Sequence, residues 1–150
     1  MAHLEASVDV RASPETVWQF LSDLRRVPEY VPATEEILWI SEGPVGAGTV
    51  YRERTRLGPM KAVTQWRITA WEPPRRQVHE QEGKAMGMDS FGFALILEPV
   101  GEGTRLTWAG DYQLTRWLRP LDALFLRRQM RSVSQTTVAN LKAAVEAQQS

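Results

Sequence analysis

The stretch PLDALFLRRQMRSVSQTTVANLKAAVEAQ, residues Pro120–Gln148, decides the fold class. It is predicted to form one long amphipathic helix, because its apolar side chains recur near the period of one helical face. These side chains are Leu121, Leu124, Phe125, Met130, Val133, Val138, Leu141 and Val145. A helix of this length cannot bury such a stripe by itself, so it must lie on another surface.

The residues before this helix supply that surface as a sheet. Strands are expected at residues 4–10, 36–41, 49–57, 60–71, 76–82, 88–97 and 104–114, and their mostly short connections favour antiparallel pairing. Ser13 and Pro14 suit the start of a short helix after the first strand, and an irregular stretch follows at 27–34. We therefore predict one α+β domain over residues 1–150, a curved seven-stranded antiparallel sheet wrapped around the long C-terminal helix.

The composition excludes several classes of function. Eighteen basic and eighteen acidic residues balance, which argues against a nucleic-acid partner. The chain has no cysteine, and its two histidines, His3 and His79, are far apart in the sequence. We therefore expect no disulfide, metal or cofactor. The first residues lack an apolar signal core and no apolar run approaches the length of a membrane span, so the protein is expected to be soluble and cytoplasmic.

The alternation of residues along each strand predicts which side chains face the helix. In the third strand Arg52, Arg54 and Arg56 alternate and belong outside, so the residues between them point inward. The same interpretation of the other strands and the helix predicts a ligand-binding set of Tyr51, Glu53, Thr55, Thr64, Trp66, Phe91, Phe93, Trp108, Tyr112, Met130, Val133 and Thr137. Its aromatic members either fill a core or line an apolar pocket.

No spacing of nucleophile and base identifies a catalytic site, and the candidates are Glu53, His79 and Tyr112. An inward Glu53 either pairs with an arginine, which we expect, or has a raised pKa and serves a ligand. We expect His79 on the outer surface, because Val78 competes for the inward position. The alternative is a general base at the rim of a pocket.

The segment Arg116–Arg131 is basic and also carries apolar side chains. Its basic residues are Arg116, Arg119, Arg127, Arg128 and Arg131, set against Asp122, with Trp117, Leu118 and Leu121 among them. We expect a solvated face beside a core face. The alternative is a transient contact with an anionic membrane surface, or with a ligand carboxylate at the pocket mouth.

Several motifs resemble those of a known superfamily. They are Ala12-Ser13-Pro14-Glu15-Thr16-Val17-Trp18 at the first helix, Asp23, Tyr30 and Pro32 in the irregular stretch, Trp71-Glu72-Pro73-Pro74-Arg75 at a strand end, and Gly103-Thr104-Arg105-Leu106-Thr107 at the start of the last strand. With the element order, they resemble the START-like superfamily, also called SRPBCC, whose helix-grip fold is that of the birch pollen allergen. Within it the chain is most similar to the bacterial polyketide cyclase/dehydrase and lipid-transport-like group.

This resemblance implies three functions. The leading hypothesis is binding or transport of a hydrophobic small molecule, such as a lipid, an isoprenoid or a polyketide-like aromatic. The second is an enzyme of the cyclase/dehydratase type, in which Glu53, His79 or Tyr112 moves a proton. The third is an interaction module that senses a ligand through the long helix. An acid–base pair in the cavity would favour the enzyme, an apolar cavity the carrier and a filled one the interaction module.

Overall fold

The computed structural model describes residues 2–121 and 125–148 and confirms the predicted α+β class with its antiparallel sheet. The strands are β1 Ala2–Val10, β2 Thr34–Ile40, β3 Val50–Leu57, β4 Met60–Glu72, β5 Arg76–Glu82, β6 Met88–Val100 and β7 Gly103–Leu114. The helices in these ranges are α1 Pro14–Ser22, η1 Leu24–Glu29, η2 Arg116–Leu118, α2 Arg119–Leu121 and α3 Arg127–Ala147, where η marks a 3-10 helix.

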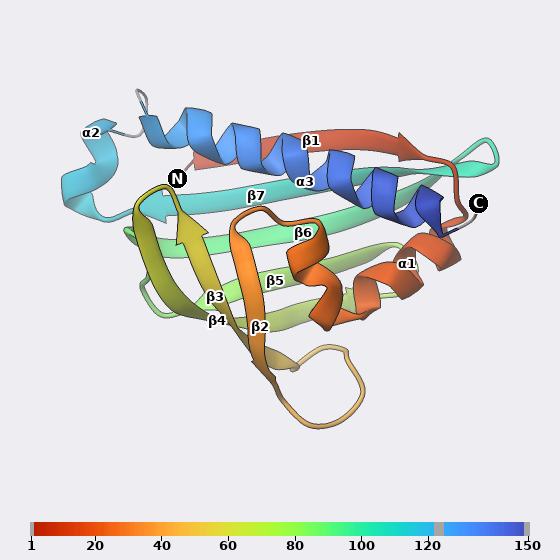
Figure 1. Cartoon of the computed structure of the whole chain (residues 1–150), viewed down its shortest axis with the longest axis horizontal. Coiled ribbons are helices and arrows are strands. Elements are labelled where there is room, and N and C mark those ends of the chain that lie inside the picture. Colours follow the sequence, from red (N-terminus) through yellow and green to blue (C-terminus); the bar gives the residue numbers. More distant parts are fainter. Residues whose placement is uncertain (1, 122–124, 149–150) are drawn as a thin grey trace.

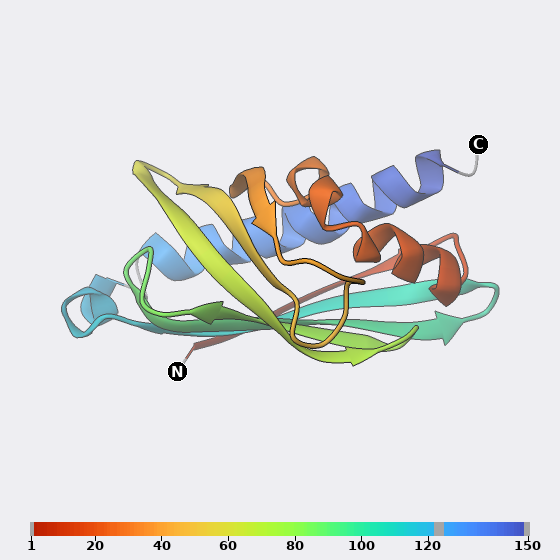
Figure 2. The same ribbon diagram turned by 90° about the horizontal axis from the view of Figure 1, so that it is seen from below.

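The seven strands form one antiparallel sheet in the order β1-β7-β6-β5-β4-β3-β2. α1 and α3 lie on the same face of this sheet, and the β3–β4 hairpin rises toward them (Figure 2). The sheet therefore curves around the helices instead of lying flat beneath them. Arg52, Arg54 and Arg56 on β3 are exposed on the outer face, whereas Glu53 between them is buried, as their alternation predicts.

The prediction of one helix over Pro120–Gln148 is wrong at its N-terminal end. α2 and α3 are separate elements, and α2 is turned away from the axis of α3 beyond the end of β1 (Figure 1). None of the described strands lies beneath α2 to cover an apolar stripe, and Phe125 is 69% exposed. Leu124 and the side chain of Leu121, also assigned to the stripe, lie outside the described residues.

α3 packs against β1, and the C-terminal half of α3 carries fully buried apolar side chains. Val138, Leu141 and Val145 are all buried, and α1 closes the same end of the molecule (Figure 1). Polar contacts fix this end, because Lys142 Nζ donates to the Asp9 carbonyl oxygen over 2.7 Å. We call this region, in which Val138, Leu141 and Val145 pack on β1 and α1, the closed end.

The short helix α1 closes this end because its sequence specifies both its start and its buried face. The Ser13 hydroxyl accepts a hydrogen bond from the Thr16 backbone N–H at 3.2 Å, and Pro14 occupies the first turn, as predicted. Val17, Phe20 and Leu21 are almost fully buried. The start of α1 and its apolar face are thus set by residues close together in the sequence.

Candidate ligand-binding cavity

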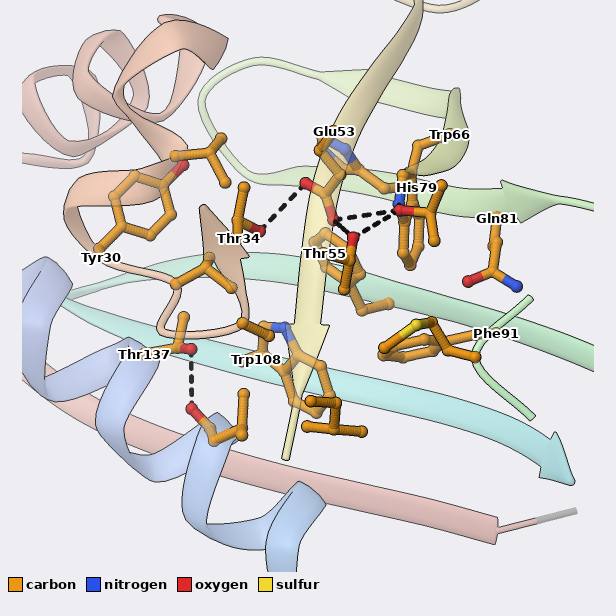
Figure 3. Close-up of a pocket in the computed structure, with 18 of the residues that line it drawn as sticks. Tyr30, Thr34, Glu53, Thr55, Trp66, His79, Gln81, Phe91, Trp108 and Thr137 are labelled. Carbon is orange, nitrogen blue, oxygen red and sulfur yellow. Dashed lines mark hydrogen bonds between the residues drawn. The ribbon is translucent and has the colours of Figure 1, made fainter. Parts of the chain in front are cut away.

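A cavity lies between the concave face of the sheet, η1 and the N-terminal half of α3 (Figure 3). The space open to the centres of water molecules is about 100 Å³. Its walls are formed by Leu21, Val27, Tyr30, Val31, Ala33, Thr34, Tyr51, Glu53, Thr55, Leu57, Thr64, Trp66, Gln77, His79, Gln81, Met86, Met88, Phe91, Phe93, Leu95, Trp108, Met130, Val133 and Thr137.

Of the twelve residues predicted to contact a ligand, all except Tyr112 line this cavity. Tyr112 is buried, and its ring centroid is 6.4 Å from that of Phe91, its partner on β6. Tyr112 therefore packs in the core beside the cavity instead of lining it, and its role as a catalytic candidate stays a prediction. The assignment of the other eleven residues as ligand contacts stays a prediction.

Four aromatic residues from β4, β6 and β7 form one wall of the cavity. The Trp66 ring centroid lies 5.2 Å from that of Phe91 and 5.5 Å from that of Phe93, and Phe93 stacks on Trp108 at 5.9 Å. The Trp108 ring lies over Gly110, so closely that a Cβ atom at Gly110 would collide with it. Gly110 therefore sets the tilt of Trp108 and, with it, the shape of the wall.

His79 is buried in the cavity wall, and the prediction of a surface histidine is wrong. Its Nδ1 lies 2.7 Å from the Tyr51 hydroxyl, its Nε2 lies 2.6 Å from Gln77 Oε1, and its ring stacks on Phe93. Val78 is only half-buried on the other face. On β5 the polar side chains face inward because these hydrogen bonds satisfy them there. Burial lowers the pKa of His79 to about 3, so the ring is neutral.

Glu53 also faces the cavity, and its observed partners are hydroxyl groups instead of the expected arginine. Its carboxyl oxygens accept hydrogen bonds from Thr34 and Thr55 at 3.1 Å each and from Thr64 at 3.5 Å (Figure 3). No ion pair joins it to a basic side chain within the described part of the chain. Burial raises the pKa of Glu53 to about 7, although the threonine hydrogen bonds act in the opposite direction.

Gln77 is the polar residue that the sequence interpretation missed. It is fully buried in the cavity wall, and its Nε2 has no hydrogen-bond partner among the described residues. Gln77, His79 and Gln81 are alternate residues of β5, so their side chains point to the same face of the sheet. A correct prediction for His79 would have placed all three side chains on the inner face. The misleading signal was Val78, an apolar residue on the outer side of the sheet.

The cavity contains no strong positive charge. Neither lysine nor arginine occurs in its described lining, and His79 is neutral. Within residues 2–121 and 125–148, no group of three His, Cys, Asp or Glu side chains is placed to hold a metal ion. Within the described lining, Glu53 is therefore the side chain that can carry a charge inside the cavity.

One half-exposed part of the cavity lining lies where the turn between β5 and β6 meets the residue before η2. Gln81, Met86 and Val133 are half-exposed parts of this lining. The turn that carries Met86 is held by the Thr115 N–H, which donates to the Gly87 carbonyl oxygen at 2.9 Å. The basic segment Arg116–Arg131 thus begins directly beside the mouth of the cavity.

Comparisons with known proteins agree with this architecture. Residues 1–146 match the model of the family described as polyketide cyclase / dehydrase and lipid transport. An uncharacterised protein of Mycobacterium tuberculosis is 32% identical over 108 residues, which cover 71% of this chain and 73% of the relative.

Two solved structures are similar in fold. A START superfamily protein from Mycobacterium smegmatis superposes with a TM-score of 0.81 at 16% identity, over 97% of this chain and 98% of that protein. An aromatase/cyclase from Streptomyces sp. R1128 superposes with a TM-score of 0.79 at 18% identity, over 99% of this chain and 96% of that protein. At these identities the likeness concerns the fold alone. The match over residues 1–146 is decisive, and the chain belongs to the family described as polyketide cyclase / dehydrase and lipid transport.

Proposed function

We propose that this protein binds a hydrophobic small molecule in the cavity between the sheet and α3. The observation that carries the proposal is an apolar space that the protein's own side chains leave open. One water needs roughly 10–15 Å³ by the same measure, so about 100 Å³ takes several waters or a small organic group. Because Trp66, Phe93 and Met130 line this space, an apolar ligand would be favoured over water there.

A second candidate function is proton transfer to a bound substrate, as in a cyclase or dehydratase. Glu53 favours it, because a carboxyl group with a pKa of about 7 exchanges its proton near neutral pH. The second catalytic partner is weak, since burial keeps His79 neutral and a poor base, and Tyr112 lies outside the cavity. Binding without chemistry therefore explains more of the lining than catalysis does.

Native mass spectrometry of the gently purified protein tests the binding proposal, together with calorimetric titration of 1-decanol. Val133 lines the cavity from α3, whereas Gln135 is exposed on the same helix. Val133→Trp should fill the cavity and abolish binding, and Gln135→Trp should leave binding unchanged. If Val133→Trp keeps its fold by circular dichroism and still binds as tightly as the wild type, the ligand does not occupy this cavity.

We also propose that the mouth of the cavity touches an anionic membrane surface during ligand exchange. Trp117 is 85% exposed and Phe125 is 69% exposed, and exposed arginines such as Arg116, Arg119 and Arg128 lie close to them in the sequence. Exposed aromatic and basic groups together are typical of interfacial binding. Within the described residues, no helix is long and apolar enough to span a bilayer.

A further inference from the structure

We infer that the cavity selects uncharged hydrophobic molecules that carry an oxygen atom, such as an alcohol, phenol or ketone, and rejects carboxylates of the same size. This inference rests on the proposed binding function and names the ligand class for the same cavity. It follows from three features of the lining: the absence of a cation, the presence of one acidic side chain and a spare hydrogen-bond donor.

The absence of a cation makes a buried carboxylate unfavourable. An anion taken from water into an apolar site needs a positive partner or several donors. The described lining offers neither lysine nor arginine, and both ring nitrogens of His79 are already occupied by Tyr51 and Gln77. Glu53 is the acidic group in this lining, and its ionised form would repel a carboxylate.

The spare donor comes from the chain of hydrogen bonds through Tyr51, His79 and Gln77. In one sense Tyr51 donates to Nδ1 and Nε2–H donates to Gln77 Oε1, which leaves the Gln77 Nε2 hydrogens free. In the reverse sense the Gln77 amide donates to Nε2, Nδ1–H donates to Tyr51, and the Tyr51 hydroxyl hydrogen is free. Each sense leaves a donor on a residue that lines the cavity.

An uncharged ligand oxygen is the group that this donor fits. A buried donor without an acceptor is unfavourable, so a ligand that supplies a carbonyl or hydroxyl oxygen gains the missing hydrogen bond. Glu53 lies two residues after Tyr51 on β3 and also lines the cavity. Its carboxyl group can donate a hydrogen bond when protonated and accepts hydrogen bonds when ionised. A ligand hydroxyl is compatible with either state of Glu53, whereas a carboxylate is compatible only with the protonated one.

Calorimetric titration of the full chain with 1-decanol, decanoate, decylamine and decane tests this inference at about pH 8, where Glu53 is largely ionised. At this pH the fatty acid is ionised and the amine is protonated. We expect 1-decanol to bind at least tenfold more tightly than decanoate and more tightly than decylamine. Gln77→Leu should weaken binding of 1-decanol by about fivefold, leave decane unaffected and thereby remove the preference for the alcohol, whereas Gln135→Leu on the exposed face of α3 should change neither.

The outcomes separate this inference from the proposed function. If decanoate binds as tightly as 1-decanol, the cavity binds hydrophobic molecules but the selection against carboxylates is wrong. If decylamine binds most tightly, Glu53 acts as a counter-ion, and the inference of an uncharged ligand is overturned. If none of the four compounds binds the wild-type protein, the binding function itself fails, and this inference fails with it. The wild-type comparison of alcohol and carboxylate stands even if Gln77→Leu does not fold.

Discussion

The two halves of α3 face different surroundings, although they belong to one helix. At the closed end, Val138, Leu141 and Val145 are almost completely buried against β1 and α1. Toward the other end, Met130 and Val133 face a cavity that side chains leave partly open. The closed end contributes stability through close packing. Side chains at the cavity end make fewer packing contacts, because the cavity beside them is partly open.

The cavity end also buries carboxyl, amide and imidazole groups. Glu53, Gln77 and His79 are buried within the cavity wall, and Gln77 retains an unpaired donor. Buried polar groups reduce stability unless they are fully hydrogen-bonded, so an unpaired donor beside an open space is better explained by ligand binding than by folding. We therefore expect substitutions at the two ends to separate stability from binding.

The largest effect should come from Leu141→Ala at the closed end. Leu141 is fully buried, so its truncation should reduce the free energy of unfolding by about 2–5 kcal/mol. Urea denaturation measures this loss, and the affinity for 1-decanol should stay unchanged where the variant is folded. Val133→Ala is the matched truncation at the cavity end and should lose less stability, because Val133 is only half-buried. Equal losses would remove the distinction between the two ends.

Glu53→Gln should increase stability at about pH 8. A carboxyl pKa raised from 4.5 to about 7 means that the folded protein holds this proton more strongly than the unfolded chain. The contribution of Glu53 to stability therefore falls as the pH rises through this window, by about 3 kcal/mol in total. The variant should remove this fall.

The control for that experiment is the same pair of unfolding curves at about pH 4, where Glu53 is protonated in both states and the two proteins should differ little. The titratable groups that share the cavity with Glu53 are Tyr30 and Tyr51, whose pKa values are raised, and His79, whose pKa is about 3. His79 acts in the opposite direction to Glu53 over part of this window, because its pKa falls from 6.5 to about 3 on folding and its contribution to stability therefore rises with pH between these values. The two proteins share His79, so the difference between their stabilities isolates the contribution of Glu53. A stability difference between Glu53→Gln and the wild type that is the same at pH 4 and pH 8 would contradict the assignment to Glu53.

Gly110→Ala should change the shape of the cavity. The new methyl group would occupy the position of the Trp108 ring, which must then move or strain the backbone of β7. We expect a loss of about 1–3 kcal/mol in the free energy of unfolding and an altered tryptophan fluorescence spectrum. Ala109→Ser on the opposite face of β7 serves as the control. An unchanged spectrum for Gly110→Ala would show that Gly110 does not position Trp108.

Trp117→Ser should have the smallest effect on stability, within about 0.5 kcal/mol, because Trp117 is almost fully exposed. Its expected effect is on membrane contact. Co-sedimentation with vesicles that contain anionic phospholipid should fall for the variant, whereas Trp39→Ser, an exposed tryptophan on β2, should not reduce it. Equal sedimentation of all three proteins would contradict a membrane contact at the cavity mouth.

The sequence predicted the fold well because the fold depends on periodic features. The alternation of Arg52, Arg54 and Arg56 fixed the register of β3, and the Ser13-Pro14 pair marked the start of α1. The prediction failed at His79 because the inner face of β5 was inferred from one apolar residue, Val78. In the structure, the hydrogen bonds of His79 with Tyr51 and Gln77 stabilise the opposite arrangement, with the polar side chains inside. The partners of Glu53 come from three strands, and no local pattern in the sequence brings them together.

Methyl NMR of the protein titrated with 1-decanol tests the proposed binding site most directly. The two ends of α3 both carry methyl groups, so each reports on its own surroundings. We predict shifts at Met130 and Val133, with intermolecular contacts to the ligand, and none at Leu141 or Val145. Shifts confined to the closed end, or contacts of the ligand only with exposed methyl groups, would contradict the claim that the space between the sheet and the N-terminal half of α3 is the binding site.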